Sequence, residues 1–367
     1  MKLSKEERKA KVRKHTKKII HIFFKFFLIF LIFFMVTNIL VFVILNIYHH
    51  NQLDKEKQYL VQTGKQVEVN GHYMNVVTGG KEDAKYTYVF MHSARIVDDS
   101  VALQPLWKEM RDDCRFAYVD RSGVGFSDVS GESREIDVMN DETRKALLGA
   151  GVKPPYILVP MGTAGIEALH WANKYPDEVI GIFGIGMSYP EQYEGMKTID
   201  YCGFTDWLMV RFFKVGGSRL VSSLKPEDLA GIYTNDQMET RKALIYKGAY
   251  TDDMYEEDLA MVDNAAKVQK EGWPKDIPIT VLYGNPVMEP YIKLDKEKQE
   301  TIKKAQETRP DLDYAEVYNY DLREFYKDKK NVTFEELSGP SRVYTFDPKG
   351  VKEKLVEFGK NVESKQK

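Results

Sequence analysis

Cysteine and histidine are scarce in this sequence of 367 residues. The 2 cysteines, Cys114 and Cys202, form neither a CxxC motif nor a metal-ligand spacing. Two cysteines are too few for a disulfide framework, although one optional bridge between them stays open. The missing ligand spacing predicts no metal site, and we expect no cofactor. The last of the 7 histidines is His170, so the remaining chain contains none. Repeats and low-complexity tracts are also lacking, and aromatic residues are spread along the chain, as a packed domain requires.

The main part of the chain lacks an excess of basic residues. The formal net charge is −2, but residues 1–25 alone hold 10 Lys/Arg against Glu6 and Glu7. The rest of the chain therefore carries 43 basic and 53 acidic side chains. Because phosphate binding needs a basic face, this acidic body argues against nucleic acid as the partner.

The longest apolar run, residues 26–47, reads FFLIFLIFFMVTNILVFVILNI and has no charged residue. A helix of these 22 residues is about 30 Å long, the thickness of the hydrocarbon core of a bilayer. A cleaved signal peptide would have a shorter apolar region and a small-residue cleavage site, which NIYHH at residues 46–50 does not offer. The run therefore predicts an uncleaved, single-pass signal-anchor helix.

The flanking charges predict the orientation of this helix. Basic residues precede it, whereas the 12 residues after it carry two lysines and two acids. Since positive flanks remain on the cytoplasmic side, we expect residues 1–25 to form a cytoplasmic tail and the main domain to lie outside the cytoplasm. We expect residues 48–65 to form a short polar stalk.

The remaining sequence alternates β-rich runs with longer amphipathic stretches, which is typical of a mostly parallel sheet flanked by helices. A hairpin is predicted at Asn70-Gly71, and His72 directly after it is expected to be exposed. Residues 188–273 break the alternation and are aromatic and helix-like, so we predict a helical cap over the strand ends. The predicted strands are Tyr86–Met91, Phe116–Asp120, Tyr156–Pro160, Ile180–Ile185 and Ile279–Tyr283.

Three motifs in order carry a resemblance to a known family. VDRSGVGFSD (119–128) is similar to a D-R-x-G-x-G-x-S loop, and VFMHS (89–93) is similar to a strand that ends in His-Gly. YILVPMGTAGIEALHWANKYPDEV (156–179) is similar to a strand, nucleophile elbow and helix. The chain thus resembles the α/β-hydrolase superfamily, in its proline-iminopeptidase-like and lipase-like branch. The resemblance implies an α/β-hydrolase fold over residues 66–360, followed by a polar tail at 361–367.

The resemblance also implies that the nucleophile has been lost. The elbow reads PMGTAG, in which Gly162 stands where the family has its serine. The residue after the nucleophile, here Thr163, contributes its backbone N–H to the oxyanion hole in the family, with its side chain facing elsewhere. Glycine at 162 would relieve the backbone strain of the elbow.

The general base is missing as well. Residues 336–351 are similar to the loop that carries the family's histidine, and Arg342 is the best match to that position. A guanidinium stays protonated and cannot act as a base. The acid position is uncertain, with Glu289 as the nearest carboxylate. His92 and Ser93 are expected to line the cleft beside the oxyanion hole, with His92 in a structural role.

These features favour a membrane-anchored, non-catalytic pseudoenzyme that binds a small molecule or a protein. Arg95 and Arg342, with the helix start at Thr163, are candidates for binding an anionic ligand. One alternative is an active hydrolase or lyase with a displaced nucleophile such as Ser93 or Ser341. Another is adhesion through the aromatic surface of the cap.

Overall fold

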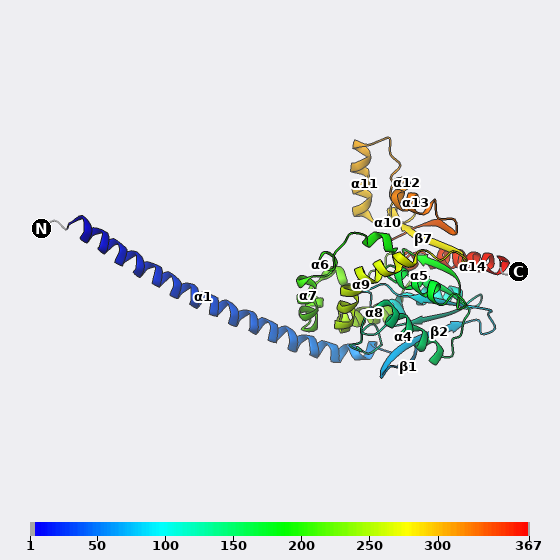
Figure 1. The fold of residues 1–367 in the computed structure, drawn as a ribbon, viewed down its shortest axis with the longest axis horizontal. Coiled ribbons are helices and arrows are strands. Elements are labelled where there is room, and N and C mark those ends of the chain that lie inside the picture. Colours follow the sequence, from blue (N-terminus) through cyan, green and yellow to red (C-terminus); the bar gives the residue numbers. More distant parts are fainter. Residues whose placement is uncertain (1–3, 366–367) are drawn as a thin grey trace.

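The chain opens with a helix that is far longer than its apolar run. The computed structural model describes residues 4–365, and α1 (Lys5–Glu56) is a continuous helix of 52 residues that leads into the main domain (Figure 1). All side chains from residue 26 to residue 44 are exposed. Within the described chain, α1 is the helix that is long and apolar enough to cross a membrane. Residues 1–3 of the expected tail lie outside the described residues.

An eight-stranded sheet, in the order β1-β2-β4-β3-β5-β6-β7-β8, forms the centre of the domain. β1 and β2 pair in antiparallel fashion, as do β2 and β4, and all other neighbours are parallel. The β1–β2 hairpin turns at Asn70 and Gly71, whose φ angles of 51° and 88° fit a type I′ turn. The strands are β1 Lys65–Val69, β2 His72–Gly80, β3 Thr87–Met91, β4 Arg115–Val119, β5 Tyr156–Pro160, β6 Val179–Ile185, β7 Ile279–Asn285 and β8 Val332–Ser338.

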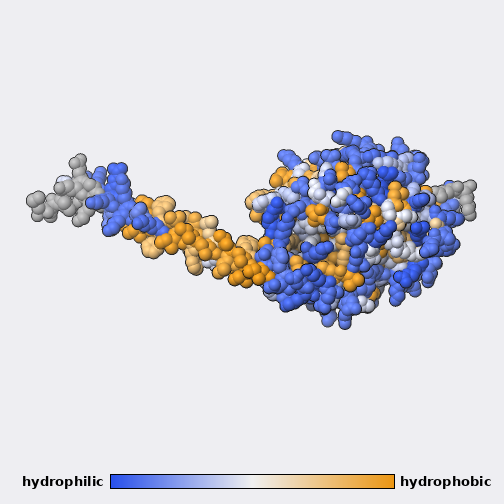
Figure 2. All heavy atoms as spheres, turned by 90° about the horizontal axis from the view of Figure 1, so that it is seen from below, coloured by the Kyte–Doolittle hydropathy of each residue, from blue (hydrophilic) through white to orange (hydrophobic). Residues whose placement is uncertain are grey.

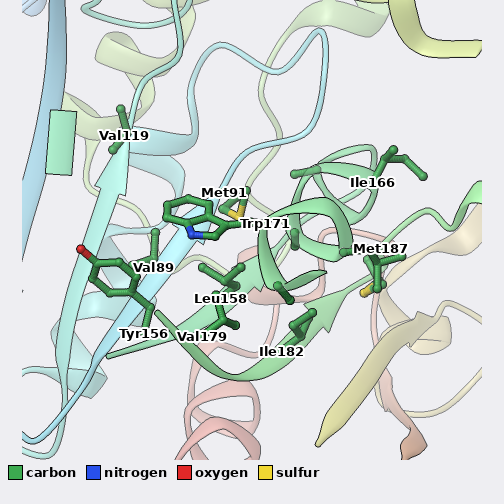
Figure 3. Close-up of a cluster of buried hydrophobic side chains, with 14 of the residues drawn as sticks. Val89, Met91, Val119, Tyr156, Leu158, Ile166, Trp171, Val179, Ile182 and Met187 are labelled. Carbon is green, nitrogen blue, oxygen red and sulfur yellow. The ribbon is translucent and has the colours of Figure 1, made fainter. Parts of the chain in front are cut away.

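Helices cover both faces of this sheet, which is why every residue of β3 and β5 is buried. One face packs on α4 (Ile136–Gly149), α5 (Ala164–Lys174) and α9 (Asp252–Glu271), and the other packs on α3 (Gln104–Met110) and α14 (Pro348–Lys365). Figure 3 shows part of the first layer, where the ring of Trp171 on α5 lies 5.9 Å from that of Tyr156 on β5.

The segment between β6 and β7 contains the helices expected for a cap. They form a small core of their own, in which Val210, Ile245 and Tyr246 pack together with Val97 of the sheet domain. The first helices are η2 Pro190–Tyr193, α6 Thr198–Tyr201, α7 Phe204–Lys214, η3 Gly217–Leu220 and η4 Ser222–Leu224. The last are α8 Asn235–Gly248 and α9, and Thr234 and Thr251 cap their N-termini with side-chain hydrogen bonds.

A second insertion, between β7 and β8, was not expected from the sequence. It stands away from the sheet in Figure 1, and its longest helix has no buried residue. Its helices are α10 Tyr291–Leu294, α11 Lys296–Thr308, α12 Tyr314–Val317 and α13 Tyr320–Tyr326. The remaining short helices of the chain are η1 Lys57–Tyr59, α2 Asp99–Ala102 and η5 Val343–Thr345.

Three local expectations change. His72 is buried, not exposed, because the hairpin turns it inward, where its Nε2 lies 3.9 Å from Glu142. Residues 48–56 of the expected stalk are the last turns of α1. Residues 361–365 of the expected tail belong to α14, since Val362 packs into the core, and residues 366–367 lie outside the described residues. The optional bridge is absent, since the two cysteines are free and buried.

Candidate functional site

The nucleophile elbow is present as backbone geometry. β5 ends at Pro160, Met161 bridges to Ile185, and α5 begins at Ala164. Gly162 between them has a φ of 51°, a left-handed conformation that favours glycine. A Cβ at Gly165 would lie 2.1 Å from the backbone oxygen of Ser188, which explains why a small residue is required there.

Ser93 occupies the space that a side chain at position 162 would need. A Cβ built on Gly162 would lie 2.3 Å from Ser93 Oγ and 2.8 Å from Ser93 Cβ. Carbon contacts below 3.0 Å are essentially never seen. A serine at position 162 therefore requires Ser93 to move or to lose its side chain.

Two backbone N–H groups beside the elbow, those of Ala94 and Thr163, are paired within the protein. The N–H of Ala94 donates to Thr163 Oγ1 at 2.7 Å, and the N–H of Thr163 donates to Ser93 Oγ at 3.4 Å. The two hydroxyl oxygens lie 3.5 Å apart. The Thr163 side chain was expected to face elsewhere; instead it turns toward Ala94, because a buried backbone N–H needs an acceptor. Sequence reasoning missed this pairing, since it depends on a rotamer.

His92 lies at the end of β3 with both ring nitrogens engaged. Arg121 Nε can only donate, so His92 Nε2 accepts its hydrogen bond at 2.9 Å, and Nδ1–H donates to Ser93 O at 2.8 Å. Burial, together with the Arg121 charge, lowers the pKa of His92 well below its usual value. A neutral imidazole whose Nε2 lone pair is already used cannot take a proton from a nucleophile, so this geometry supports a structural role.

Arg121 organises a buried charge cluster that sequence reasoning did not single out. Its guanidinium pairs with Glu167 of α5 and, at 2.9 Å, with Glu257 of the cap helix α9. Burial raises the pKa of Glu257 to about 7. The D-R pair in the 119–128 motif was the available signal for Arg121. The cluster links the elbow helix α5 to α9 of the cap.

Arg342, which was expected at the histidine position, is held by two buried acids. Its Nη2 lies 3.1 Å from Asp98 Oδ1 and 2.5 Å from Asp99 Oδ1, and its Nε donates to Tyr344 Oη at 2.8 Å. Arg241 Nε donates to the other oxygen of Asp98 at 2.7 Å. Burial raises the pKa of Asp99, whereas Arg342 and Arg241 overcome the effect of burial and lower the pKa of Asp98.

Arg95 is likewise paired. Its backbone has a φ of 62°, rare for a residue with a side chain. Its Nε donates to Asp258 at 2.5 Å and its Nη2 to Asp206 at 3.0 Å, and the guanidinium lies 4.5 Å from the centre of the Tyr250 ring. The pairing compensates the charges of Arg95 and Arg342, which the sequence alone suggested as free anion-binding groups.

The acid position is not filled by Glu289. This carboxylate is exposed, pairs with Lys293 one helical turn away, and lines a separate crevice beside α11. The strand before it ends in the buried Asn285, whose Nδ2 donates to Glu336. The structure therefore does not bring Glu289 to the elbow.

An open cleft of about 390 Å³ lies between the cap and the 340–346 loop. It is lined by Arg95, Ser341 and Arg342 but not by His92, Ser93 or Thr163, because the latter side chains pack on one another. No group of three His, Cys, Asp or Glu residues within the described chain could hold a metal ion. The other charged residues of the cleft are Asp98, Lys225, Glu227 and Arg241.

Comparison with solved structures shows the fold. A candidate lipase (lip1) from Acinetobacter baumannii AYE superposes with a TM-score of 0.55 at 16% identity, covering 86% of this chain and 97% of that one. Haloalkane dehalogenase DbeA from Bradyrhizobium elkani USDA94 gives a TM-score of 0.52 at 15% identity, covering 82% and 98%. These likenesses establish an α/β-hydrolase fold and no activity.

Comparison with known sequences identifies a family. A scan against models of protein families gives no match. The uncharacterized protein YbdG of Bacillus subtilis (strain 168) is 37% identical over 251 residues, which cover 66% of this chain and 75% of YbdG. The chain therefore belongs to the family of YbdG and has an α/β-hydrolase fold with one N-terminal apolar helix.

Proposed function

We propose that this protein is a membrane-anchored pseudoenzyme that binds a ligand or partner in the cleft under its cap and does not turn it over. The observation that carries the proposal is the pairing of the backbone N–H groups beside the elbow. The N–H of Thr163, which is the expected oxyanion donor, and the N–H of Ala94 already bind hydroxyl oxygens. A substrate oxyanion would have to displace them, and each such hydrogen bond contributes about 0.5–1.5 kcal/mol.

Three independent losses support the absence of hydrolysis. Position 162 offers no nucleophile, Arg342 stands where the base is expected, and the Nε2 lone pair of His92 is used by Arg121. An enzyme that lacks its triad retains about 10³–10⁴-fold over water, from binding and oxyanion donors. Here the donors are occupied too, so even this residual rate is expected to fall.

An acidic ligand is favoured by Lys225, one of the cations that line the cleft. Three further cations line the cleft, but an acid pairs with each of them: Asp258 with Arg95, Asp98 with Arg241 and Asp99 with Arg342. Arg342 and Arg241 are held by Asp98, so Lys225 on the cap side is the cation best placed to respond to a ligand. A carboxylate of the ligand would accept a charge-assisted hydrogen bond from Lys225 in this cleft.

The anchor supports a location at a membrane. The exposed apolar surface of residues 26–44 needs a nonpolar environment, and the basic flank before it favours a cytoplasmic N-terminus with the domain on the other side. The protein would thus present its cleft outside the cytoplasm.

Ligand-induced thermal shift of the detergent-solubilised full-length protein tests the binding role. The probes are small carboxylic acids, each beside its neutral amide. We expect acids to raise the melting temperature more than amides, and Lys225→Gln to reduce the difference. Ser341→Trp, which fills the cleft, should abolish the shift, whereas the exposed Ser133→Trp on another surface serves as the matched control. Equal shifts in the two tryptophan variants would refute the assignment of the cleft.

A further inference from the structure

The end of α1 is packed against the cap. His49, two residues after the apolar run, is 3% exposed and lies against Gly216. A Cβ at Gly216 would come within 2.5 Å of His49 Cβ, and the φ of 98° at this position also favours glycine. One helical turn later, Leu53 packs on the apolar core of the cap. The absence of a side chain at 216 therefore lets the cap backbone approach the helix closely.

Arg219 fixes this contact. Its two Nη atoms each lie 2.7 Å from an oxygen of Glu56, and its Nε donates to His49 Nδ1 at 3.0 Å. The guanidinium also lies 4.3 Å from the centre of the Tyr246 ring on α8. Since both partners of the ion pair are largely buried, the last two turns of α1 and the cap form one unit.

This arrangement leaves almost no spacer between the apolar run and the domain. From Ile47 to Glu56 the helix rises about 14 Å, and the docking contacts begin at His49. Side chains become partly covered already at Leu45 and Asn46. If residues 26–47 cross a bilayer, the cap must lie directly at the bilayer surface.

The cap elements on that side expose large apolar side chains. Figure 1 shows α6 and α7 on the side of the domain that faces the N-terminal part of α1, and Figure 2 shows apolar surface continuing from α1 to the near edge of the domain. Ile199, Phe204 and Leu220 are each 68% exposed. The exposed large apolar residues of α6, α7 and η3, here called the cap face, are Ile199, Phe204, Trp207, Leu208, Met209 and Leu220.

The chemistry of the cap face fits a lipid interface. Trp207 stacks on Phe204 with ring centroids 5.6 Å apart, and Arg211 lies 4.5 Å from the Trp207 ring. Tryptophan beside aliphatic side chains and a cation is typical of the boundary between headgroups and acyl chains. By contrast, α11 has the sequence KEKQETIKKAQET and offers no such surface.

We infer that the cap face rests on the surface of the same bilayer that α1 crosses. This inference depends on α1 being a membrane span, but not on the cleft being non-catalytic or on any ligand. The bilayer is favoured over a protein partner because the buried Arg219–Glu56 contact holds this face beside the apolar run. The cap would then be held at the bilayer by α1 and by the contact of the cap face with lipid.

Tryptophan fluorescence of the full-length protein tests the contact. Of the 4 tryptophans, Trp107 and Trp171 are buried and Trp273 is packed on Phe325, whereas Trp207 lies on the cap face. The protein is reconstituted into phosphatidylcholine vesicles with or without bromine atoms near the top of the acyl chains. We expect brominated lipid to quench the emission that Trp207 contributes, measured as the difference between wild type and Trp207→Phe.

Two variants sharpen this test. Phe204→Ser/Leu208→Ser should reduce the quenching, whereas Leu148→Ser, a matched exposed leucine on α4, should leave it unchanged. If the protein floats with the vesicles but the emission of Trp207 is not quenched, the contact of the cap face is refuted and the membrane anchor is not. Failure to float with vesicles would overturn the span and the contact together. Dimers that appear in detergent and are lost in Phe204→Ser/Leu208→Ser would assign the face to a second copy.

Discussion

Restoring the nucleophile by Gly162→Ser is expected to destabilise this protein. Position 162 has a φ of 51°, and a residue with a side chain in this conformation costs about 1–2 kcal/mol. The new Cβ would lie 2.3 Å from Ser93 Oγ, and relieving such overpacking costs about 1–3 kcal/mol. The free energy of unfolding should therefore fall by about 2–5 kcal/mol.

A double-mutant cycle separates the two contributions. Thermal unfolding of the full-length protein in detergent gives the stability, and a loss of 1 kcal/mol lowers the Tm of a large domain by roughly 2–4 °C. The Ser93→Gly/Gly162→Ser variant should be more stable than the sum of the single effects by about 1–3 kcal/mol, because the clash is gone. A Gly162→Ser protein as stable as wild type, or one that shows no coupling to Ser93, would refute this reasoning.

Two further predictions concern buried charges. Arg219→Ala should leave Glu56 buried and unpaired, and should lower the free energy of unfolding by about 3–5 kcal/mol. It should also make residues 57–64 accessible to limited proteolysis, and Arg219→Lys should have an intermediate effect. Unchanged cleavage would contradict the docking of α1. Burial raises the pKa of Asp120 to about 7, so the folded state holds this proton more tightly than the unfolded state, and stability falls as the pH rises toward 7. The side chain of Asp120→Asn cannot titrate, so the stability of this variant relative to wild type should be higher at pH 8 than at pH 5. The difference in the free energy of unfolding should change by at most about 1.4 kcal/mol per pH unit. Parallel pH profiles of stability would contradict the raised pKa.

Much of the fold could be predicted from patterns along the chain. β5 was predicted with its observed bounds, and the turn at Asn70-Gly71 formed as expected, because short apolar runs and turn residues are local signals. The insertion that holds α11 was missed, since Ile302 and Ala305 are the two apolar residues of this helix and none of its side chains is fully buried.

The residues of the candidate site could be proposed from the sequence, but the contacts of their side chains could not. Gly162 and Arg342 follow from the order of motifs. The contact of Arg342 with Asp99 joins residues 243 positions apart, and the turn of Thr163 toward Ala94 is a rotamer choice. Such contacts depend on tertiary packing, which cannot be predicted from the composition of the chain or from the spacing of its motifs.

The docking of α1 was missed for a related reason. His49 and Glu56 read as polar residues of a linker, and only their partner Arg219, which lies 163 positions after Glu56, makes them buried. The glycine pair at 216–217 was the one local sign that the cap backbone is closely approached there.

On this geometry, the elbow is expected to be unable to activate a nucleophile. The most direct test treats the full-length protein with a fluorophosphonate, which reacts covalently with activated serines, and locates adducts by mass spectrometry, with an active serine hydrolase as positive control. We predict no adduct on Ser93, Thr163 or Ser341 and no ester turnover above the buffer rate. An adduct on Ser93, with turnover that disappears in Ser93→Ala, would contradict the account and identify an enzyme with a displaced nucleophile.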